Sequence, residues 1–175
     1  LMNPPIRYTE DKDTLWKRLK DGTIDCIVTD HAPHTLEAKS AGFPMAPAGM
    51  PGVETSLPVM LTHAVGGKCR VTDVVRWMSE GPAKVYGIEK KGSIIEGYDA
   101  DLTLVDLETH RIMSDEDTWT KVGWTPYAGR ELTGWPIYTI VDGKIVHRRE
   151  IGGSLKGISV AEPGSAGRVL KFNQF

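Results

Sequence analysis

The sequence lacks an excess of charge of either sign, a long apolar run and enough cysteines for a disulfide framework. Its 21 Lys and Arg residues stand against 23 Asp and Glu residues, a net charge of -2, which does not favour binding to nucleic acid or to an anionic membrane. No stretch approaches the roughly 18 apolar residues of a membrane span, and the first residues, LMNPPIRYTEDKD, lack a signal-peptide pattern. We therefore expect a soluble, cytoplasmic protein. Neither Cys26 nor Cys69 belongs to a CxxC pair, and both are interpreted as small core residues.

The chain is also too short for one common fold. A complete (β/α)8 barrel needs about 250 residues, or about 200 in a compact form, whereas this sequence has 175. It opens on Leu1 directly at a motif and without an initiating Met. We expect it to be a piece of something larger.

The first third of the sequence has an α/β pattern. Residues 9–22 predict a helix with Thr9 as N-cap, an apolar stripe and Gly22 as the stop. Residues 23–30, TIDCIVTD, form a nearly continuous apolar run, which is typical of a parallel strand buried on both faces. A Pro- and Gly-rich loop over 31–53 then leaves the carboxyl end of that strand, the end that carries the chemistry in such folds.

The rest of the sequence changes from helical to β-rich. Helices are predicted over 54–65, over 72–79 with Thr72 as N-cap, and over 82–86. From about residue 91, the segments GSII, DLTLVD, IYTIVDG and KIVHRR read as strands, with Asp142-Gly143 as a hairpin turn. We predict three parts: 1–90 with the last barrel elements and the active-site loop, 91–150 as a β-sandwich portion, and 151–175 as a loosely ordered tail.

The polar residues that end the predicted strand are candidates for chemistry. A carboxylate at the end of a buried parallel strand, here Asp30, is held rigidly and can bind a metal or move a proton. Asp30 is equally explained as a cap of the following turn. His31 and His34 on the loop do not make a metal site alone, because zinc needs three or four convergent ligands.

Four motifs in register make the sequence recognisable. They are MNPPIR (2–7), DGTIDCIVTDHAPH (21–34), APAGMPGVET (46–55) and GSIIEGYDADLTLVD (92–106). Together they resemble the carboxyl-terminal part of class I dihydroorotases, members of the amidohydrolase superfamily. Related allantoinases and hydantoinases share the strand-end Asp and the DADLTLVD-type pattern but usually lack the second His of TDHAPH, here His34.

The resemblance implies a fold and a reaction. The fold is the carboxyl-terminal portion of a metal-dependent (β/α)8 barrel, followed by strands of a small β-sandwich domain. One or two Zn2+ ions would lie at the barrel mouth, and the enzyme would interconvert dihydroorotate and N-carbamoyl-L-aspartate in pyrimidine biosynthesis. Partners implied beyond this small-molecule substrate are a homo-oligomer or a complex with aspartate transcarbamoylase.

The resemblance also assigns roles to residues. Asp30 matches a metal ligand that accepts the proton of a metal-bound water and returns it to the departing nitrogen. His34 matches a contact to the substrate carboxylate, and Asn3 a substrate-contacting amide. Ala48 and Gly49 fall where the family presents backbone to the pyrimidine ring, although many relatives carry a bulky aromatic in place of Ala48.

Other polar residues are expected to be structural. Arg7 and Glu54 are assigned to fixing loops or starting helices. Three histidines lie outside every motif and are interpreted as structural: His63, His110 and His147.

Most of the metal ligands that the resemblance requires are missing. The superfamily takes them from an HXH pair, a bridging lysine or carboxylate and two further histidines, and no HXH occurs in this sequence. One carboxylate cannot hold zinc at useful affinity, so the chain alone is expected to be inactive. Three interpretations stay open: a fragment of an active dihydroorotase, a non-catalytic partner of aspartate transcarbamoylase, and a fragment of an allantoinase- or hydantoinase-type enzyme.

Overall fold

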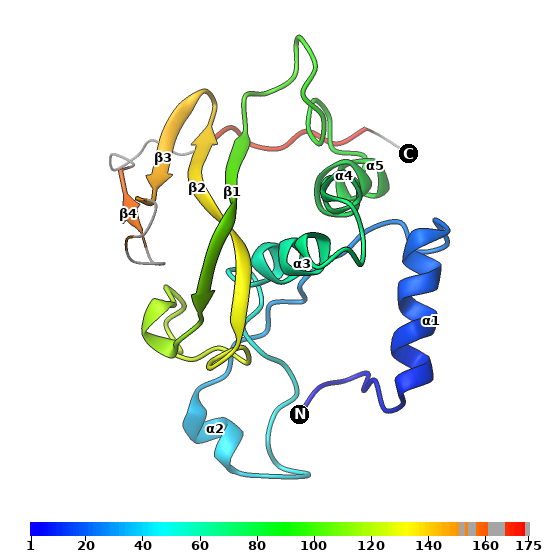
Figure 1. Ribbon diagram of the computed structural model, residues 1–175, viewed down its shortest axis with the longest axis vertical. Helices are drawn as coiled ribbons and strands as arrows, with labels where there is room; N and C mark the ends of the chain where they lie inside the picture. Colours follow the sequence, from blue (N-terminus) through cyan, green and yellow to red (C-terminus); the bar gives the residue numbers. More distant parts are fainter. Residues whose placement is uncertain (151–152, 154–156, 161–166, 174–175) are drawn as a thin grey trace.

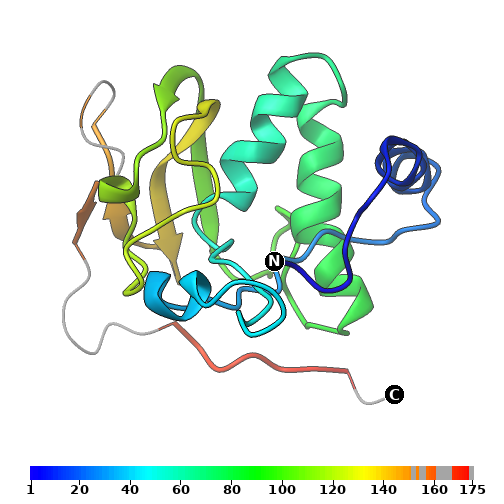
Figure 2. The same cartoon turned by 90° about the horizontal axis from the view of Figure 1, so that it is seen from below.

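The computed structural model describes residues 1–150, 153, 157–160 and 167–173, and within them it is an α/β structure. A four-stranded antiparallel sheet lies on one side, and α3, the α4–α5 helical rod and α1 follow one another away from it (Figures 1 and 2). The helical elements are α1 (Thr9–Lys20), α2 (Leu36–Ser40), α3 (Ser56–Val65), α4 (Val71–Val75), the π-helical turn η1 (Arg76–Glu80), α5 (Gly81–Val85) and the 3-10 turn η2 (Asp115–Asp117). The strands are β1 (Leu102–Ile112), β2 (Glu131–Val141), β3 (Lys144–Arg148) and β4 (Ile158–Ser159), in the order β1-β2-β3-β4.

Helix α3 packs directly on strand β2. Gly134 of β2 has a φ of +87°, and a Cβ added there would lie 2.6 Å from the Leu61 Cβ. Beside it, the Thr133 amide donates to the Thr62 hydroxyl at 2.8 Å. A glycine is required at this position because helix and strand approach too closely for any side chain.

Two apolar clusters lie on either side of this contact. One gathers Leu19, Met60, Leu61, Val74 and Trp77 between the helices. The other gathers Met113, Leu132 and Trp135 on the sheet side. The contact between α3 and β2 therefore joins two cores into one body.

Helices α4 and α5 and the π turn form one uninterrupted rod over residues 71–85, so the prediction of two separate helices is wrong. The sequence pattern suggested a break because Pro82 has no N–H and its ring crowds the preceding turn. A wider π turn accommodates that proline without ending the helix. The Trp77 carbonyl in this turn accepts the Ile27 amide at 2.9 Å, and Gly81 leaves no room for a Cβ against the Asp25 carbonyl.

The predicted strand at 23–30 is absent. This segment belongs to no strand, Val28 is 60% exposed, and Asp30 is exposed with a φ of +42°. A strand exists through hydrogen bonds to neighbouring strands, and the described residues place none beside this segment. Its apolar side chains Ile24 and Ile27 still pack against the helical core.

Other local expectations can be checked in the same way. The helices expected at 9–22 and 54–65 are confirmed as α1 and α3, but Tyr8 and Arg70 occupy the N-cap positions predicted for Thr9 and Thr72. The Asp142-Gly143 turn between β2 and β3 is confirmed, with φ values of +50° and +77°. The GSII segment is not a strand.

The tail expected over 151–175 lies partly outside the described residues. Of the described ones, β4 pairs with β3, and the segment around Phe172 forms an isolated bridge with Ile88. In Figure 2 this last segment runs along one end of the molecule. Among the helices of the described part of the chain, none is long and apolar enough to cross a membrane.

A glycine substitution tests the contact between α3 and β2. Gly134→Ala should lower the free energy of unfolding by about 1–3 kcal/mol more than Gly129→Ala, because overpacking adds to the cost of a positive φ. Gly129 is the matched control, since its φ is +80° and nothing lies within 4 Å of an added Cβ. Urea unfolding of both variants measures the difference, and equal losses would contradict the close approach.

The packing of α1 on α3 should depend on pH. The Trp16 ring meets the His63 ring edge-on at 5.1 Å, and burial, followed by the nearby Lys68 ammonium, lowers the pKa of His63. The unfolded chain then binds more protons than the folded one, so stability falls as pH drops below the ordinary histidine value of about 6.5. His63→Gln should remove part of the loss of unfolding free energy between about pH 7.5 and about pH 5.5. An unchanged pH profile in this variant would exclude His63 as the cause.

Candidate functional site

Two loop segments, 29–34 and 48–53, lie side by side at the end of the apolar segment where the sequence predicted chemistry. The Ala32 amide donates to the Met50 carbonyl at 3.2 Å. Gly49 has a φ of +122°, and a Cβ there would lie 2.7 Å from the Ala32 Cβ. The two backbones are thus in direct contact, and only glycine fits at position 49.

The candidate substrate residues His34, Ala48 and Gly49 meet in this pair of segments. The His34 Nε2 lies 3.1 Å from the Ala48 carbonyl oxygen. Because a carbonyl can only accept, Nε2 carries the proton of this hydrogen bond. The second ring nitrogen, Nδ1, is then the one that can face a ligand, and it donates to a carboxylate only when the ring is the imidazolium cation.

His31 has a different environment from His34. Its Nδ1 accepts the amides of Gly52 and Val53 at 3.1 and 3.3 Å. This nitrogen therefore holds the second segment in place.

Glu54 and Trp124 tie the loop to the segment that follows β1. The two carboxylate oxygens of Glu54 accept the amides of Trp119 and Thr120 at 2.7 and 2.8 Å. The Trp124 indole donates to the His34 carbonyl at 2.7 Å. The loop-fixing role expected for Glu54 is confirmed by these bonds.

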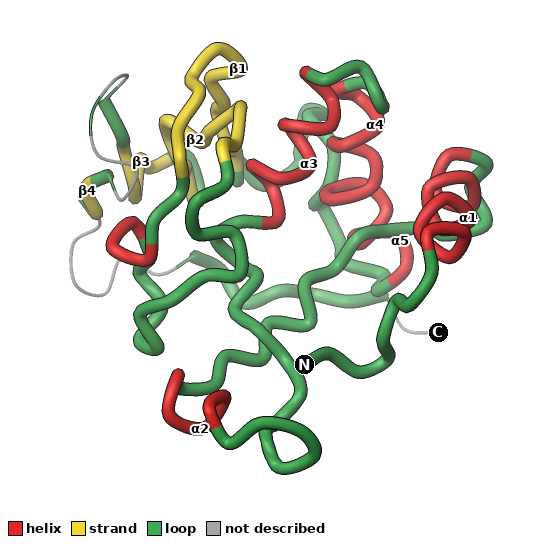
Figure 3. Tube along the Cα trace, turned by 60° about the horizontal axis from the view of Figure 1, so that its bottom comes forward, coloured by secondary structure: helices red, strands yellow, loops and turns green. Residues whose placement is uncertain are grey.

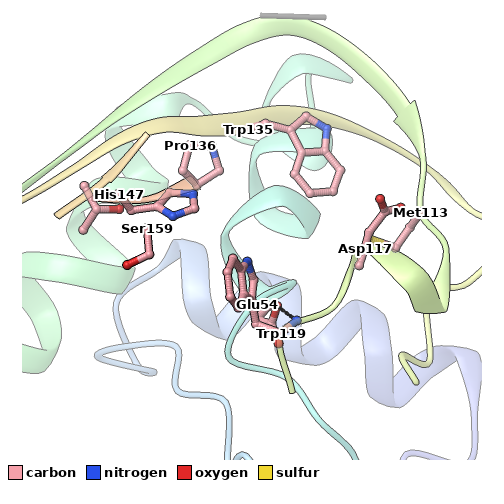
Figure 4. Close-up of a pocket in the computed structure, with 9 residues that line it drawn as sticks. Glu54, Met113, Asp117, Trp119, Trp135, Pro136, His147 and Ser159 are labelled. Carbon is pink, nitrogen blue, oxygen red and sulfur yellow. Dashed lines mark hydrogen bonds between the residues drawn. The ribbon is translucent and has the colours of Figure 1, made fainter. Parts of the chain in front are cut away.

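Glu54 also borders a cavity of about 400 Å³ on the sheet side, lined by Trp119, Trp135 and His147 (Figure 4). His147 faces this cavity from β3. Burial, followed by the nearby Arg149 charge, lowers the pKa of His147. No residue of the segments 29–34 and 48–53 is among the residues that line this cavity.

Asp30 belongs to the first of these two segments, whereas Asn3 is linked to the second, within the described residues, only through its neighbour Leu1. The Leu1 carbonyl, two residues before Asn3, accepts the Gly49 amide at 3.1 Å. Asp30 immediately precedes His31 and is exposed. In Figure 3 the N-terminal end of the chain and the loop that carries α2 occupy the same side of the molecule.

The described residues do not fit a complete metal site. Among them, no group of three His, Cys, Asp or Glu side chains is close enough together to hold an ion. Asp30 supplies one carboxylate, whereas zinc sites need three or four ligands. Within the described part of the chain, Asp30 therefore lacks the further ligands that a zinc ion would need.

The described residues thus define an α/β protein in which His34, Ala48 and Gly49 meet where two loop segments pair. The model of the amidohydrolase family matches residues 7–146, so the chain belongs to this family. The family predicted from the four motifs is confirmed.

Relatives named dihydroorotase support the same conclusion. The chain is 44% identical over 152 residues to a dihydroorotase of Anoxybacillus flavithermus and 43% identical over 150 residues to one of Bacillus cytotoxicus. These matches cover 86% and 85% of the chain but 35% of each relative. The chain therefore spans about a third of the length of these relatives.

Solved structures of hydantoinases have the same fold over nearly the whole chain. The L-hydantoinase (dihydropyrimidinase) from Arthrobacter aurescens matches with a TM-score of 0.85 and 34% identity, over 97% of this chain and 37% of that one. The D-hydantoinase (dihydropyrimidinase) from Thermus sp. matches with a TM-score of 0.81 and 28% identity, over 98% and 37%.

Sequence reasoning missed two residues that hold the site. Lys39 donates to three loop carbonyls, and Trp124 reaches His34 from 90 positions away. Neither residue has a local pattern that indicates a role, because each acts through contacts between distant segments.

Substitution of Gly49 tests the pairing of the two segments. Gly49→Ala should push residues 48–50 away from Ala32 and speed hydrogen exchange of the Ala32 amide by about tenfold or more, because its acceptor moves. Gly42→Ala is the matched control in the same loop, with a φ of +69° and nothing within 4 Å of an added Cβ. Exchange of Ala32 at the same rate in both variants would show that the segments are not in contact.

Proposed function

We propose that this chain is the carboxyl-terminal part of a dihydroorotase, which hydrolyses the cyclic amide of dihydroorotate and forms it in the reverse direction. The observation that carries the proposal is His34, the second histidine of TDHAPH, set against the Ala48 carbonyl in a chain 44% identical to a protein named dihydroorotase. A histidine at this position suits a substrate that carries a carboxylate. Pyrimidine biosynthesis is the pathway that this activity implies.

A hydantoinase-type activity is the second candidate. Its support is the TM-score of 0.85 to the L-hydantoinase from Arthrobacter aurescens. That structure is 34% identical, whereas the proteins named dihydroorotase are 43–44% identical. The two candidates share cyclic-amide hydrolysis and differ in whether the substrate carries a carboxylate.

The proposed architecture of the whole protein divides the chain into two parts. Helices α1 and α3 to α5 and the segment 23–30 would belong to a (β/α)8 barrel, and the sheet of β1 to β3 to a small β-sandwich domain. The apolar segment 23–30, with Val28 60% exposed, supports this division, because in a barrel it would gain strand neighbours on both sides.

In the proposed reaction Asp30 is the proton carrier. Its carboxylate would accept a proton from the attacking water and give it to the departing ring nitrogen, so that one residue serves both steps. His34 and Asn3 would bind the substrate carboxylate and ring, with the backbone at Ala48 and Gly49 beside them. We further propose that the whole protein holds zinc, with Asp30 as one ligand and the remaining ligands upstream of this chain.

The upstream sequence separates a catalytic protein from a non-catalytic one. An HXH pair and two further histidines there would complete a metal site. Their loss would favour a non-catalytic partner of aspartate transcarbamoylase.

Two substitutions in the full-length protein test the assignment. Asp30→Asn should nearly abolish turnover of saturating dihydroorotate, because an amide cannot accept a proton at neutral pH. His34→Ala should weaken substrate binding by about ten- to a hundredfold, the range for a hydrogen bond to a charged group, with partial rescue by more substrate.

Steady-state kinetics with dihydroorotate and hydantoin, and zinc analysis in parallel, measure both effects. Asp25→Asn is the matched control, an exposed carboxylate in the same segment. Turnover by Asp30→Asn above a few per cent of the wild type would contradict the role of Asp30. Preference for hydantoin would favour the second candidate.

A further inference from the structure

Lys39 of α2 binds three backbone carbonyls at the candidate site. Its Nζ donates to the carbonyl oxygens of Pro47 and Gly49 at 2.9 Å each, and to that of Leu1 at 3.2 Å. Three donors thus meet three acceptors. The ammonium group joins α2, the loop that carries Ala48 and the first residue of the chain.

The position of Lys39 fixes the direction of two amide groups. A trans peptide unit points its C=O and N–H in opposite directions, and the cis peptides of the described residues lie elsewhere, at Asn3-Pro4 and Phe43-Pro44. Because the carbonyls of Pro47 and Gly49 point to Lys39, the amides of Ala48 and Met50 point away from it. Within the described residues neither amide has an acceptor.

The charge of Lys39 is not cancelled by a carboxylate. Among the ion pairs of the described residues, none includes Lys39, which is partly buried. A cation bound to a carbonyl polarises the peptide unit and strengthens its N–H as a donor. The loop backbone therefore presents two polarised donors beside His34, whose ring lies against the Ala48 carbonyl.

We propose that Lys39 is a positioning residue that holds the Ala48 and Met50 amides as donors for an oxygen of an anionic cyclic-amide substrate. The inference rests on the proposed function and adds to it the residue that shapes the binding wall. Because the donors are backbone groups, this arrangement does not depend on the side chain at position 48, where Ala48 replaces the aromatic of many relatives.

The test compares Lys39→Met with Lys84→Met in the full-length protein. Methionine keeps an unbranched side chain without the ammonium, and Lys84 is an exposed lysine of α5 whose side chain makes no hydrogen bond among the described residues. Lys39→Met should speed hydrogen exchange of the Ala32 and Gly49 amides by about tenfold or more, while the Val59 amide of α3 keeps its rate. KM for dihydroorotate should rise about tenfold, with a smaller change in kcat. Lys84→Met should change neither the exchange of the Ala32 and Gly49 amides nor KM for dihydroorotate.

Lys39→Arg separates position from charge. A planar guanidinium keeps the charge but does not fit three carbonyls that converge on one atom, so exchange and KM should resemble those of Lys39→Met. Full recovery of KM by arginine with fast exchange would mean that charge alone acts, and would overturn the positioning role. The positioning role would also be overturned if Lys39→Met lowered kcat and kcat/KM equally and left KM unchanged.

The exchange measurement keeps this inference distinct from the proposed function. If the wild-type protein hydrolysed neither dihydroorotate nor hydantoin, the proposed function would fail, and with it the substrate-binding part of the inference. Equal exchange in Lys39→Met and the wild type would overturn the role of Lys39 whatever the activity.

Discussion

The contact between α3 and β2 determines how the parts of this molecule are arranged. At Gly134 the strand lies against Leu61 with no room for a Cβ, and the neighbouring Thr133 amide is bound by Thr62. Helix α3 begins immediately after the paired loop segments, so fixing α3 on the sheet also fixes the loop end. The bonds from Trp119, Thr120 and Trp124 to that loop depend on the same placement.

The candidate site consists of loop backbone. Its hydrogen-bond partners are side chains, whereas the backbone of a strand is bonded to neighbouring strands. Glu54 accepts hydrogen bonds from two backbone amides, and the His31 Nδ1 accepts them from two others. Lys39 donates hydrogen bonds to three carbonyls. Backbone groups of a Pro- and Gly-rich loop have no regular partners, and leaving them unpaired inside a protein is costly. These three side chains therefore define the loop much as hydrogen-bonded neighbours define a strand.

The sequence predicted those features that depend on near neighbours. Apolar spacing was sufficient for α1 and α3, and Asp142-Gly143 for the hairpin, because these elements are specified within a few residues. The motifs were sufficient for the family. The apolar run at 23–30 does not form the predicted strand here, because its hydrophobicity indicates burial, whereas strand pairing requires a neighbour that the described residues do not include. Lys39 and Trp124 could not be found, since spacing along the chain contains no information on contacts 38 or 90 positions apart.

The π turn η1 has a consequence for how the helical rod binds another segment. In a π turn the Trp77 carbonyl would be paired with the residue five positions later, which is Pro82 and has no N–H to donate. The freed carbonyl accepts the Ile27 amide, and Gly81 beside it lets the Asp25 and Cys26 backbone approach. A proline usually disrupts a helix, yet here it leaves one helix carbonyl free to accept a hydrogen bond from another segment. Through this hydrogen bond the helical rod fixes the position of the apolar segment 23–30 along the rod. It thereby also fixes the position of Asp30 at the end of that segment.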